Sequence, residues 1–139
     1  MRRPNRPAHP VAVRLGIHRS AVVIEDDDEI RNLICAVLER AGLYVVAAPN
    51  GLDGLAAVRA ADPAVVTVDL RMPGIGGIET IKRVRAISDA LIVVLTAVTA
   101  KHEEDASLRA GADLYMTKPF RPRELRDRVD ERLRQLREA

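Results

Sequence analysis

Apolar residues along this chain follow two patterns in turn. From residue 20 onward, five short runs rich in valine, isoleucine, leucine and alanine predict buried strands. Between and after these runs, apolar residues lie three or four positions apart, which predicts amphipathic helices. The predicted strands cover residues 21–24, 44–47, 64–68, 91–96 and 114–117. The pattern therefore predicts five strands that alternate with five helices.

Several residues mark where the predicted helices begin and end. Gly42 follows the first helix at the position where glycine often ends a helix. Asn50 is suited to cap the second helix, which ends before Pro63. The last three helices are predicted around residues 78–84, over residues 101–110 and over residues 121–137.

Strands that alternate with helices predict an α/β fold with a parallel sheet. Parallel strands need helical crossovers to return the chain, and right-handed crossovers leave few topologies. A chain of 139 residues has room for one such domain. In open parallel sheets, ligands bind beyond the carboxyl ends of the strands, so any chemistry is expected at that edge.

Composition narrows the class of protein further. No apolar run approaches the length that a membrane span needs. The single cysteine, Cys35, excludes an internal disulfide and favours a cytoplasmic protein. The three histidines (His9, His18 and His102) lack the spacing of metal ligands, so a histidine metal site is not expected.

The net charge of +2 comes from the start of the chain. Residues 1–20 hold five of the 22 basic residues and no acid, which leaves 17 bases against 20 acids, a net of −3, over residues 21–139. We interpret residues 1–19 as a disordered basic tail and residues 20–139 as the folded domain. A basic arm that binds acidic partners or nucleic acid is the alternative interpretation of the tail.

Polar residues follow or end four of the predicted strands. The acidic run 25–29 follows the first strand, Asp69 the third and Lys118 the fifth, while Thr96 ends the fourth. At one edge of a parallel sheet, crowded carboxylates repel one another, and a hard cation such as Mg²⁺ relieves this repulsion. An aspartate can also attack phosphorus to form an aspartyl-phosphate, whose oxygens a cation and a lysine would neutralise.

Each of these residues also has a simpler structural interpretation. Acidic residues favour the first turn of a helix, so Asp27, Asp28 and Glu29 are expected partly as caps and surface residues. Asp69 could begin a turn, and Thr96 suits a buried strand. Their coincidence at matching strand ends favours a shared functional site.

Four segments resemble the signature segments of response-regulator receiver domains, the CheY-like superfamily of two-component signalling. They are residues 23–27, 69–74, 95–97 and 111–120, in the order of the family. The resemblance extends over about residues 20–137. It implies a flavodoxin-like, doubly wound sheet of five parallel strands in the order 2-1-3-4-5 with five helices, and a cis Lys118–Pro119 bond.

The resemblance also implies a phosphoacceptor and a metal site. Asp69 would accept the phosphoryl group. Glu25 and Asp26 would form the acidic pair that holds Mg²⁺, with Asp26 as the direct ligand. Asp69 and the backbone carbonyl of Arg71 would complete the set of metal ligands.

Two further roles are implied at the ends of the fourth and fifth strands. Thr96 and Lys118 would contact the phosphoryl group. Tyr115 would turn inward when Thr96 shifts. Such a protein is a phosphoacceptor regulator rather than an enzyme in the usual sense, although it assists its own phosphorylation and dephosphorylation.

The implied partners belong to a phosphorelay. A histidine kinase or a phosphotransfer protein would donate the phosphoryl group. A downstream protein would bind the surface formed by helix 101–110, strand 114–117 and helix 121–137. No effector domain, membrane contact or nucleic-acid binding is expected within this chain.

Two other functions remain open. The chain could be the regulatory part of a DNA-binding regulator whose receivers dimerise through charged pairs on that same surface. The residues at the corresponding positions are Glu104 with Glu124, Leu114 with Arg128, and Arg109 with Asp130. Only the last pair is complementary, which disfavours that dimer. The other alternative is a small Mg²⁺-dependent phosphohydrolase, which generally carries a second acid two residues after its nucleophile. This chain has Arg71 there, which cannot serve as that acid, so the alternative is disfavoured.

Overall fold

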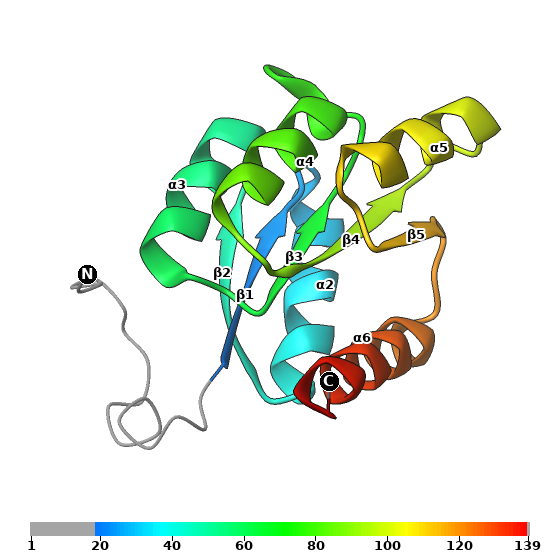
Figure 1. Cartoon of the computed structure of the whole chain (residues 1–139). Coiled ribbons are helices and arrows are strands. Elements are labelled where there is room, and N and C mark those ends of the chain that lie inside the picture. Colours follow the sequence, from blue (N-terminus) through cyan, green and yellow to red (C-terminus); the bar gives the residue numbers. More distant parts are fainter. Residues whose placement is uncertain (1–18, 139) are drawn as a thin grey trace.

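A computed structural model describes residues 19–138 of the chain as one sheet covered by helices on both faces (Figure 1). The strands are β1 (Arg19–Ile24), β2 (Leu43–Ala48), β3 (Val65–Val68), β4 (Leu91–Thr96) and β5 (Leu114–Thr117). The helices are α2 (Asp28–Arg40), α3 (Gly51–Ala61), α4 (Gly76–Ile87), α5 (Lys101–Ala110) and α6 (Pro122–Glu138). All strand pairs are parallel, in the order β2-β1-β3-β4-β5. The predicted fold class and strand order are confirmed.

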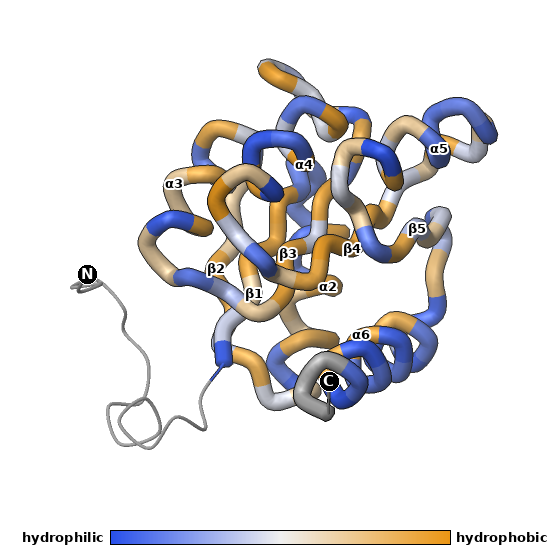
Figure 2. The backbone as a smooth tube through the Cα atoms, in the orientation of Figure 1, coloured by the Kyte–Doolittle hydropathy of each residue, from blue (hydrophilic) through white to orange (hydrophobic). Residues whose placement is uncertain are grey.

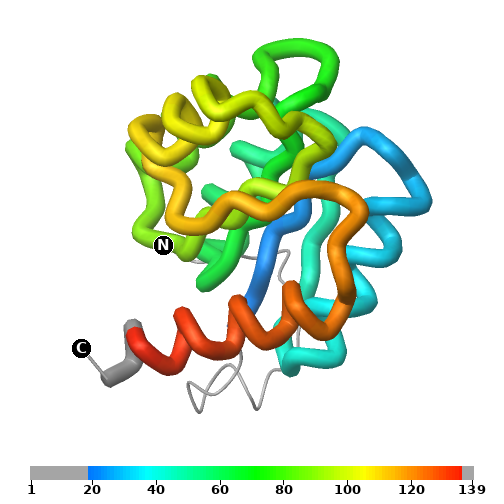
Figure 3. Tube along the Cα trace, turned by 90° about the vertical axis from the view of Figure 1, so that its right-hand side faces the viewer, coloured from blue at the N-terminus to red at the C-terminus, as the bar shows by residue number. Residues whose placement is uncertain are grey.

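The sheet is the middle of three layers (Figures 1 and 3). Side chains alternate between the two faces of β1 because successive residues of a strand point in opposite directions. Ala21 and Val23 join the core beneath α2 and α6, whereas Val22 and Ile24 join the core beneath α3 and α4. Both faces of the sheet are therefore buried, which explains why the strands read as continuous apolar runs.

Figure 2 shows the same arrangement as hydropathy, with apolar strands inside and polar positions along the outer helices. Polar side chains dominate α6, whose apolar face carries the buried Leu125, Val129 and Leu133. Leu136, which the sequence also places on this face, has no described side chain. None of the helices in residues 19–138 is both long enough and apolar enough to cross a membrane.

The predicted helix caps are present. Asp27 accepts a hydrogen bond from the backbone N–H of Ile30 at the start of α2, over 2.9 Å. Asn50 accepts one from the N–H of Asp53 at the start of α3, over 2.8 Å. Gly42, with φ +93°, follows the C-cap of α2, where the left-handed conformation favours glycine.

Two further expectations can be compared with the structure. The Lys118–Pro119 bond is cis, as the resemblance implied. Strand β1 begins at Arg19, a residue that the sequence analysis assigned to the tail, because Arg19 pairs in register with Leu43 of β2. The apolar pattern could not show this, since pairing uses the backbone and not the side chain. The rest of the proposed tail, residues 1–18, lies outside the described residues.

Candidate functional site

Three carboxylates come together at the carboxyl ends of β1 and β3. Ile24 pairs with Val68 across these parallel strands, so Glu25 and Asp69 emerge side by side. One carboxylate oxygen from each of Glu25, Asp26 and Asp69 lies within 4.8 Å of the other two. Glu25 and Asp69 are buried, with 1% and 6% of their surface exposed, whereas Asp26 is open to solvent. The structure thus forms an acidic cluster with one accessible member.

Lys118 brings a positive charge into this cluster. Its Nζ atom donates to Oε1 of Glu25 over 2.9 Å and to Oδ2 of Asp69 over 3.1 Å. Burial alone would lower the pKa of Lys118, but the hydrogen bonds to Glu25 and Asp69 outweigh it and leave that pKa raised. Lys118 therefore remains an ammonium at neutral pH.

The cluster carries an excess of negative charge even with this lysine. Burial raises the pKa of Glu25, and the nearby charge of Asp69 acts in the same direction, while the hydrogen bond from Lys118 opposes them. Three carboxylates and one ammonium give the ionised site a formal net charge of −2. Hard oxygen donors with this charge suit a divalent cation such as Mg²⁺, which commonly uses one or two carboxylates.

Thr96 lies at the end of β4 and is fully buried. Its Oγ1 accepts a hydrogen bond from the N–H of Val98 over 3.2 Å, and its backbone carbonyl accepts one from the N–H of Lys118 over 2.8 Å. The ladder between β4 and β5 therefore places Thr96 next to the strand end that carries Lys118.

Tyr115 is linked to Thr96 through the same neighbour. Its hydroxyl donates to the carbonyl oxygen of Val98 over 2.8 Å. The ring is half-buried against the core beneath α3 and α4, and this burial raises the pKa of the phenol. Val98 thus accepts a hydrogen bond from Tyr115 and donates one to Thr96, and sequence reasoning did not identify it.

Arg71 contacts Asp69 through its backbone and α5 through its side chain. Its N–H donates to Oδ1 of Asp69 over 3.2 Å. Its Nη2 atom lies 2.9 Å from Oε2 of Glu103, in the first turn of α5. Sequence reasoning missed Glu103 because 32 residues separate the partners and no local pattern connects them.

Two other residues shape the site without having been predicted. Arg31 donates from Nη1 to the carbonyl oxygen of Glu25 over 3.0 Å and pairs with Asp28 on the same helix. The spacing of three residues between Asp28 and Arg31 could have predicted that pair. No local pattern predicts the contact of Arg31 with Glu25. A Cβ atom on Gly77 would lie 2.5 Å from the carbonyl oxygen of Asp69, so only glycine lets α4 approach this closely.

Comparison with known proteins agrees with this architecture. The family model described as "Response regulator receiver domain" matches residues 21–130. The "Transcriptional regulatory protein CseB" of Streptomyces avermitilis is 41% identical over 97 residues, which cover 70% of this chain and 41% of that protein. The "DNA-binding response regulator MtrA" of Mycobacterium tuberculosis is 39% identical over 113 residues, covering 81% of this chain and 50% of that protein. The chain spans about half, or less, of the length of these curated relatives.

A solved structure shows the same fold over nearly its whole length. The CheY-like response regulator receiver domain protein of Methanospirillum hungatei superposes with a TM-score of 0.82 at 26% sequence identity. The superposition covers 88% of this chain and 99% of that one. The family match, the strand order and the acidic cluster at the strand ends agree, and this chain belongs to the response regulator receiver domains of two-component signalling.

Proposed function

We propose that this chain is a phosphorylation-dependent switch whose phosphoryl group is carried by Asp69. The observation that carries the proposal is the contact between the Lys118 ammonium and the Asp69 carboxylate within an acidic cluster. One carboxylate oxygen of Asp69 attacks the phosphorus of the donor and forms a P–O bond. The bond from phosphorus to the donor breaks, and its electron pair leaves with the donor, a histidine nitrogen in a histidine kinase or phosphotransfer protein.

We assign Mg²⁺ binding to the three carboxylates, with Asp26 as the accessible direct ligand. Glu25, Asp69 and the backbone carbonyl of Arg71 complete the proposed set. When bound, the cation supplies positive charge next to the phosphoryl oxygens. Arg31 supports this site because its hydrogen bond to the Glu25 carbonyl fixes the connection between β1 and α2.

Lys118 and Thr96 are assigned to the phosphoryl oxygens. Lys118 already donates a hydrogen bond to Oδ2 of the Asp69 carboxylate, so its ammonium needs little rearrangement to neutralise the charge that develops there. The Thr96 hydroxyl can donate to a phosphoryl oxygen once it rotates away from Val98, whose N–H it now faces. Transfer thus depends on groups held by strand ends.

The switch is proposed to act through Val98. When Thr96 leaves the N–H of Val98 and this segment shifts, Tyr115 loses the carbonyl that holds its hydroxyl and turns inward. Because Tyr115 lies on β5 beside α5, its movement changes the surface formed by α5, β5 and α6. Phosphorylation then biases a two-state element that a partner recognises.

We propose a downstream protein as the partner of that surface, in a cytoplasmic phosphorelay. Residues 1–19 are proposed as a basic tail outside the receiver domain. A second function is supported by the names of the relatives, which describe transcriptional and DNA-binding regulators. In that case the same switch would control an effector domain, and this chain itself would still not bind nucleic acid.

The chain is also proposed to assist its own dephosphorylation at a slow rate. Arg71 lies two residues after the acceptor, and its bulky charged side chain would hinder the attack of water on the phosphoryl group. We expect Arg71→Ala to shorten the lifetime of the phosphorylated protein. An unchanged rate of dephosphorylation would remove this part of the proposal.

The central experiment incubates the protein with Mg²⁺ and acetyl phosphate and follows its intact mass, with Asp69→Asn as the comparison. A gain of one phosphoryl group in the wild type alone supports the switch and its site. The absence of any gain would identify a receiver that acts without phosphorylation. A gain in both proteins would place the acceptor elsewhere.

A further inference from the structure

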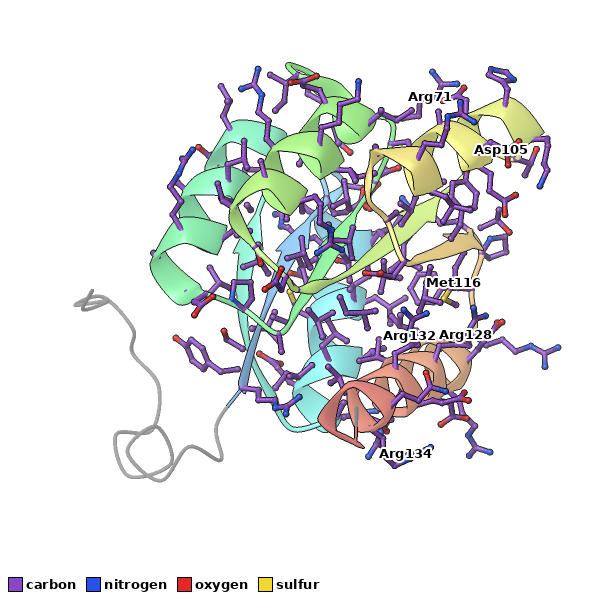
Figure 4. The ribbon with its side chains drawn as sticks, viewed as in Figure 1. Arg71, Asp105, Met116, Arg128, Arg132 and Arg134 are labelled. Carbon is purple, nitrogen blue, oxygen red and sulfur yellow. The ribbon has the colours of Figure 1, made fainter. Side chains whose placement is uncertain are left out.

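The ion pair between Arg71 and Glu103 is the contact through which the connection after β3 reaches α5. Nη2 of Arg71 lies 2.9 Å from Oε2 of Glu103, and the two side chains are 68% and 23% exposed. Figure 4 shows Arg71 beside α5, near the carboxyl ends of the strands. The two residues join segments 32 positions apart in the sequence. The pair therefore links the surroundings of Asp69 to a helix of the proposed partner surface.

Arg71 contacts both Asp69 and α5. Its backbone N–H donates to Oδ1 of Asp69 over 3.2 Å, so its position depends on the acceptor carboxylate. Its guanidinium is directed to the first turn of α5 by Glu103. A movement of either end is transmitted through one residue.

Phosphorylation would change the charges on which this pair depends. An aspartyl-phosphate at Asp69 would replace a single carboxylate charge by a group of higher negative charge and three acceptor oxygens, two residues from Arg71. A guanidinium binds such oxygens in pairs and at least as well as it binds a carboxylate. Glu103 and the phosphoryl group would then compete for one cation.

We propose that Glu103 is a positioning residue that sets the lifetime of phospho-Asp69 through Arg71. This inference rests on the proposed function. Glu103 holds the guanidinium against α5. When the ion pair with Glu103 is lost, the guanidinium of Arg71 pairs with the phosphoryl oxygens and hinders the approach of water. Because the coupling is reciprocal, a phosphoryl group that attracts Arg71 also releases the first turn of α5.

The other acids of α5 do not share this geometry. Asp105 pairs with Lys101 on the same helix, over 3.3 Å, and Glu104 has no ion pair among the described residues. Figure 4 shows Asp105 on α5, so its neutralisation removes the same charge from the same helix without touching Arg71. Asp105→Asn is therefore the matched control for Glu103→Gln.

The test measures how fast the phosphorylated protein decays after acetyl phosphate is removed, by intact mass in the presence of Mg²⁺. We expect Glu103→Gln to lengthen the lifetime about 2- to 5-fold, the range that an exposed ion pair can supply. The same substitution should have no effect in an Arg71→Ala background, and Asp105→Asn should match the wild type. Urea unfolding of the unphosphorylated proteins, with unchanged midpoints, would show that the effect is not a loss of folding.

Several outcomes would overturn the inference. They are an unchanged lifetime in Glu103→Gln, an equal change in the Arg71→Ala background, and an equal change in Asp105→Asn. If the wild type gains a phosphoryl group and loses it with time in these cases, the proposed phosphorylation of Asp69 stands and only the role of Glu103 is rejected. If the wild type gains no phosphoryl group at all, the proposed function fails first, and the inference falls with it.

Discussion

The ammonium of Lys118 donates a hydrogen bond to the Asp69 carboxylate across 3.1 Å, although 49 residues separate the two in the chain. A parallel sheet makes this contact possible, because the carboxyl ends of β3 and β5 lie at the same edge. A fixed cation at this point would stabilise charge on the transferred phosphoryl group more than charge on the free carboxylate.

Replacement of Lys118 tests that assignment. We expect Lys118→Ala to slow phosphorylation by acetyl phosphate on the order of 100-fold or more, as does the loss of a positioned donor in other active sites. Lys101→Ala is the control, since Lys101 lies on α5 and pairs with Asp105 on the surface. Intact mass against time gives both rates. Equal rates for the two variants would contradict the role of Lys118.

Binding of Mg²⁺ can be followed through stability. A cation that binds only the folded protein stabilises it by about 2.7 kcal/mol at 100 times its Kd. We expect the wild type to gain stability with Mg²⁺ and Asp26→Asn to lose most of this gain. Without Mg²⁺, Asp26→Asn should be more stable than the wild type, because it removes repulsion from the cluster.

Asp28→Asn is the control for this experiment. Asp28 belongs to the same acidic run but lies outside the cluster and pairs with Arg31. It should keep the full response to Mg²⁺ when thermal unfolding is compared in EDTA and in Mg²⁺. A response lost equally in both variants would mean that the acidic run attracts the cation without a defined site.

Arg85 makes several hydrogen bonds at the amino ends of β4 and β5, at the edge of the sheet opposite the acidic cluster. Its guanidinium donates to the carbonyl oxygens of Gly111, Ser88 and Ala90 and to the carboxylate of Asp113, over 2.9 to 3.1 Å. These contacts tie the end of α4 to the starts of β4 and β5. Lysine cannot reproduce this fork of donors.

We therefore expect Arg85→Lys to lower the free energy of unfolding by about 2–4 kcal/mol, because several partly buried acceptors lose their donor. Arg83→Lys is the matched control, since Arg83 makes only an exposed pair with Glu79 on the same helix. That change should cost less than about 0.5 kcal/mol. Urea unfolding measures the free energy of unfolding of both variants. Similar losses would show that the hydrogen bonds of Arg85 add little to stability.

Tyr115 predicts a pH dependence with a defined sign. Burial raises the pKa of its phenol above the ordinary value of 10.0, with Glu103 and Glu104 acting in the same direction. The folded state therefore holds this proton more tightly than the unfolded chain. The resulting contribution to stability is complete below about pH 10 and is lost as the pH rises through the folded-state pKa.

Absorbance at alkaline pH resolves this group, because the chain has two tyrosines and no tryptophan. The difference between the wild type and Tyr115→Phe should titrate with a midpoint above 10.0. Since the hydroxyl that binds Val98 is absent from the variant, its free energy of unfolding should fall by about 0.5–1.5 kcal/mol at neutral pH. A difference titration centred at or below pH 10 would contradict the burial of the phenol.

Much of the fold was predictable because it depends on local patterns. The apolar runs located all five strands, and the caps at Asp27 and Asn50 lie where short polar side chains can bind the free N–H groups of a helix. The edge that gathers Glu25, Asp69 and Lys118 followed from the parallel order of the strands. The part each residue would play there came from the resemblance to receiver domains.

The sequence by itself determined the α/β class and the set of residues at the carboxyl edge, because periodicity and strand ends are local features of the chain. The strand order came from the resemblance to receiver domains. Only the tertiary structure decided which side chains pair there. The contact of Arg71 with Glu103, the link of Thr96 and Tyr115 through Val98, and the start of β1 at Arg19 all join distant segments. Such contacts depend on strand register and on how helices pack against the sheet, which no local pattern encodes.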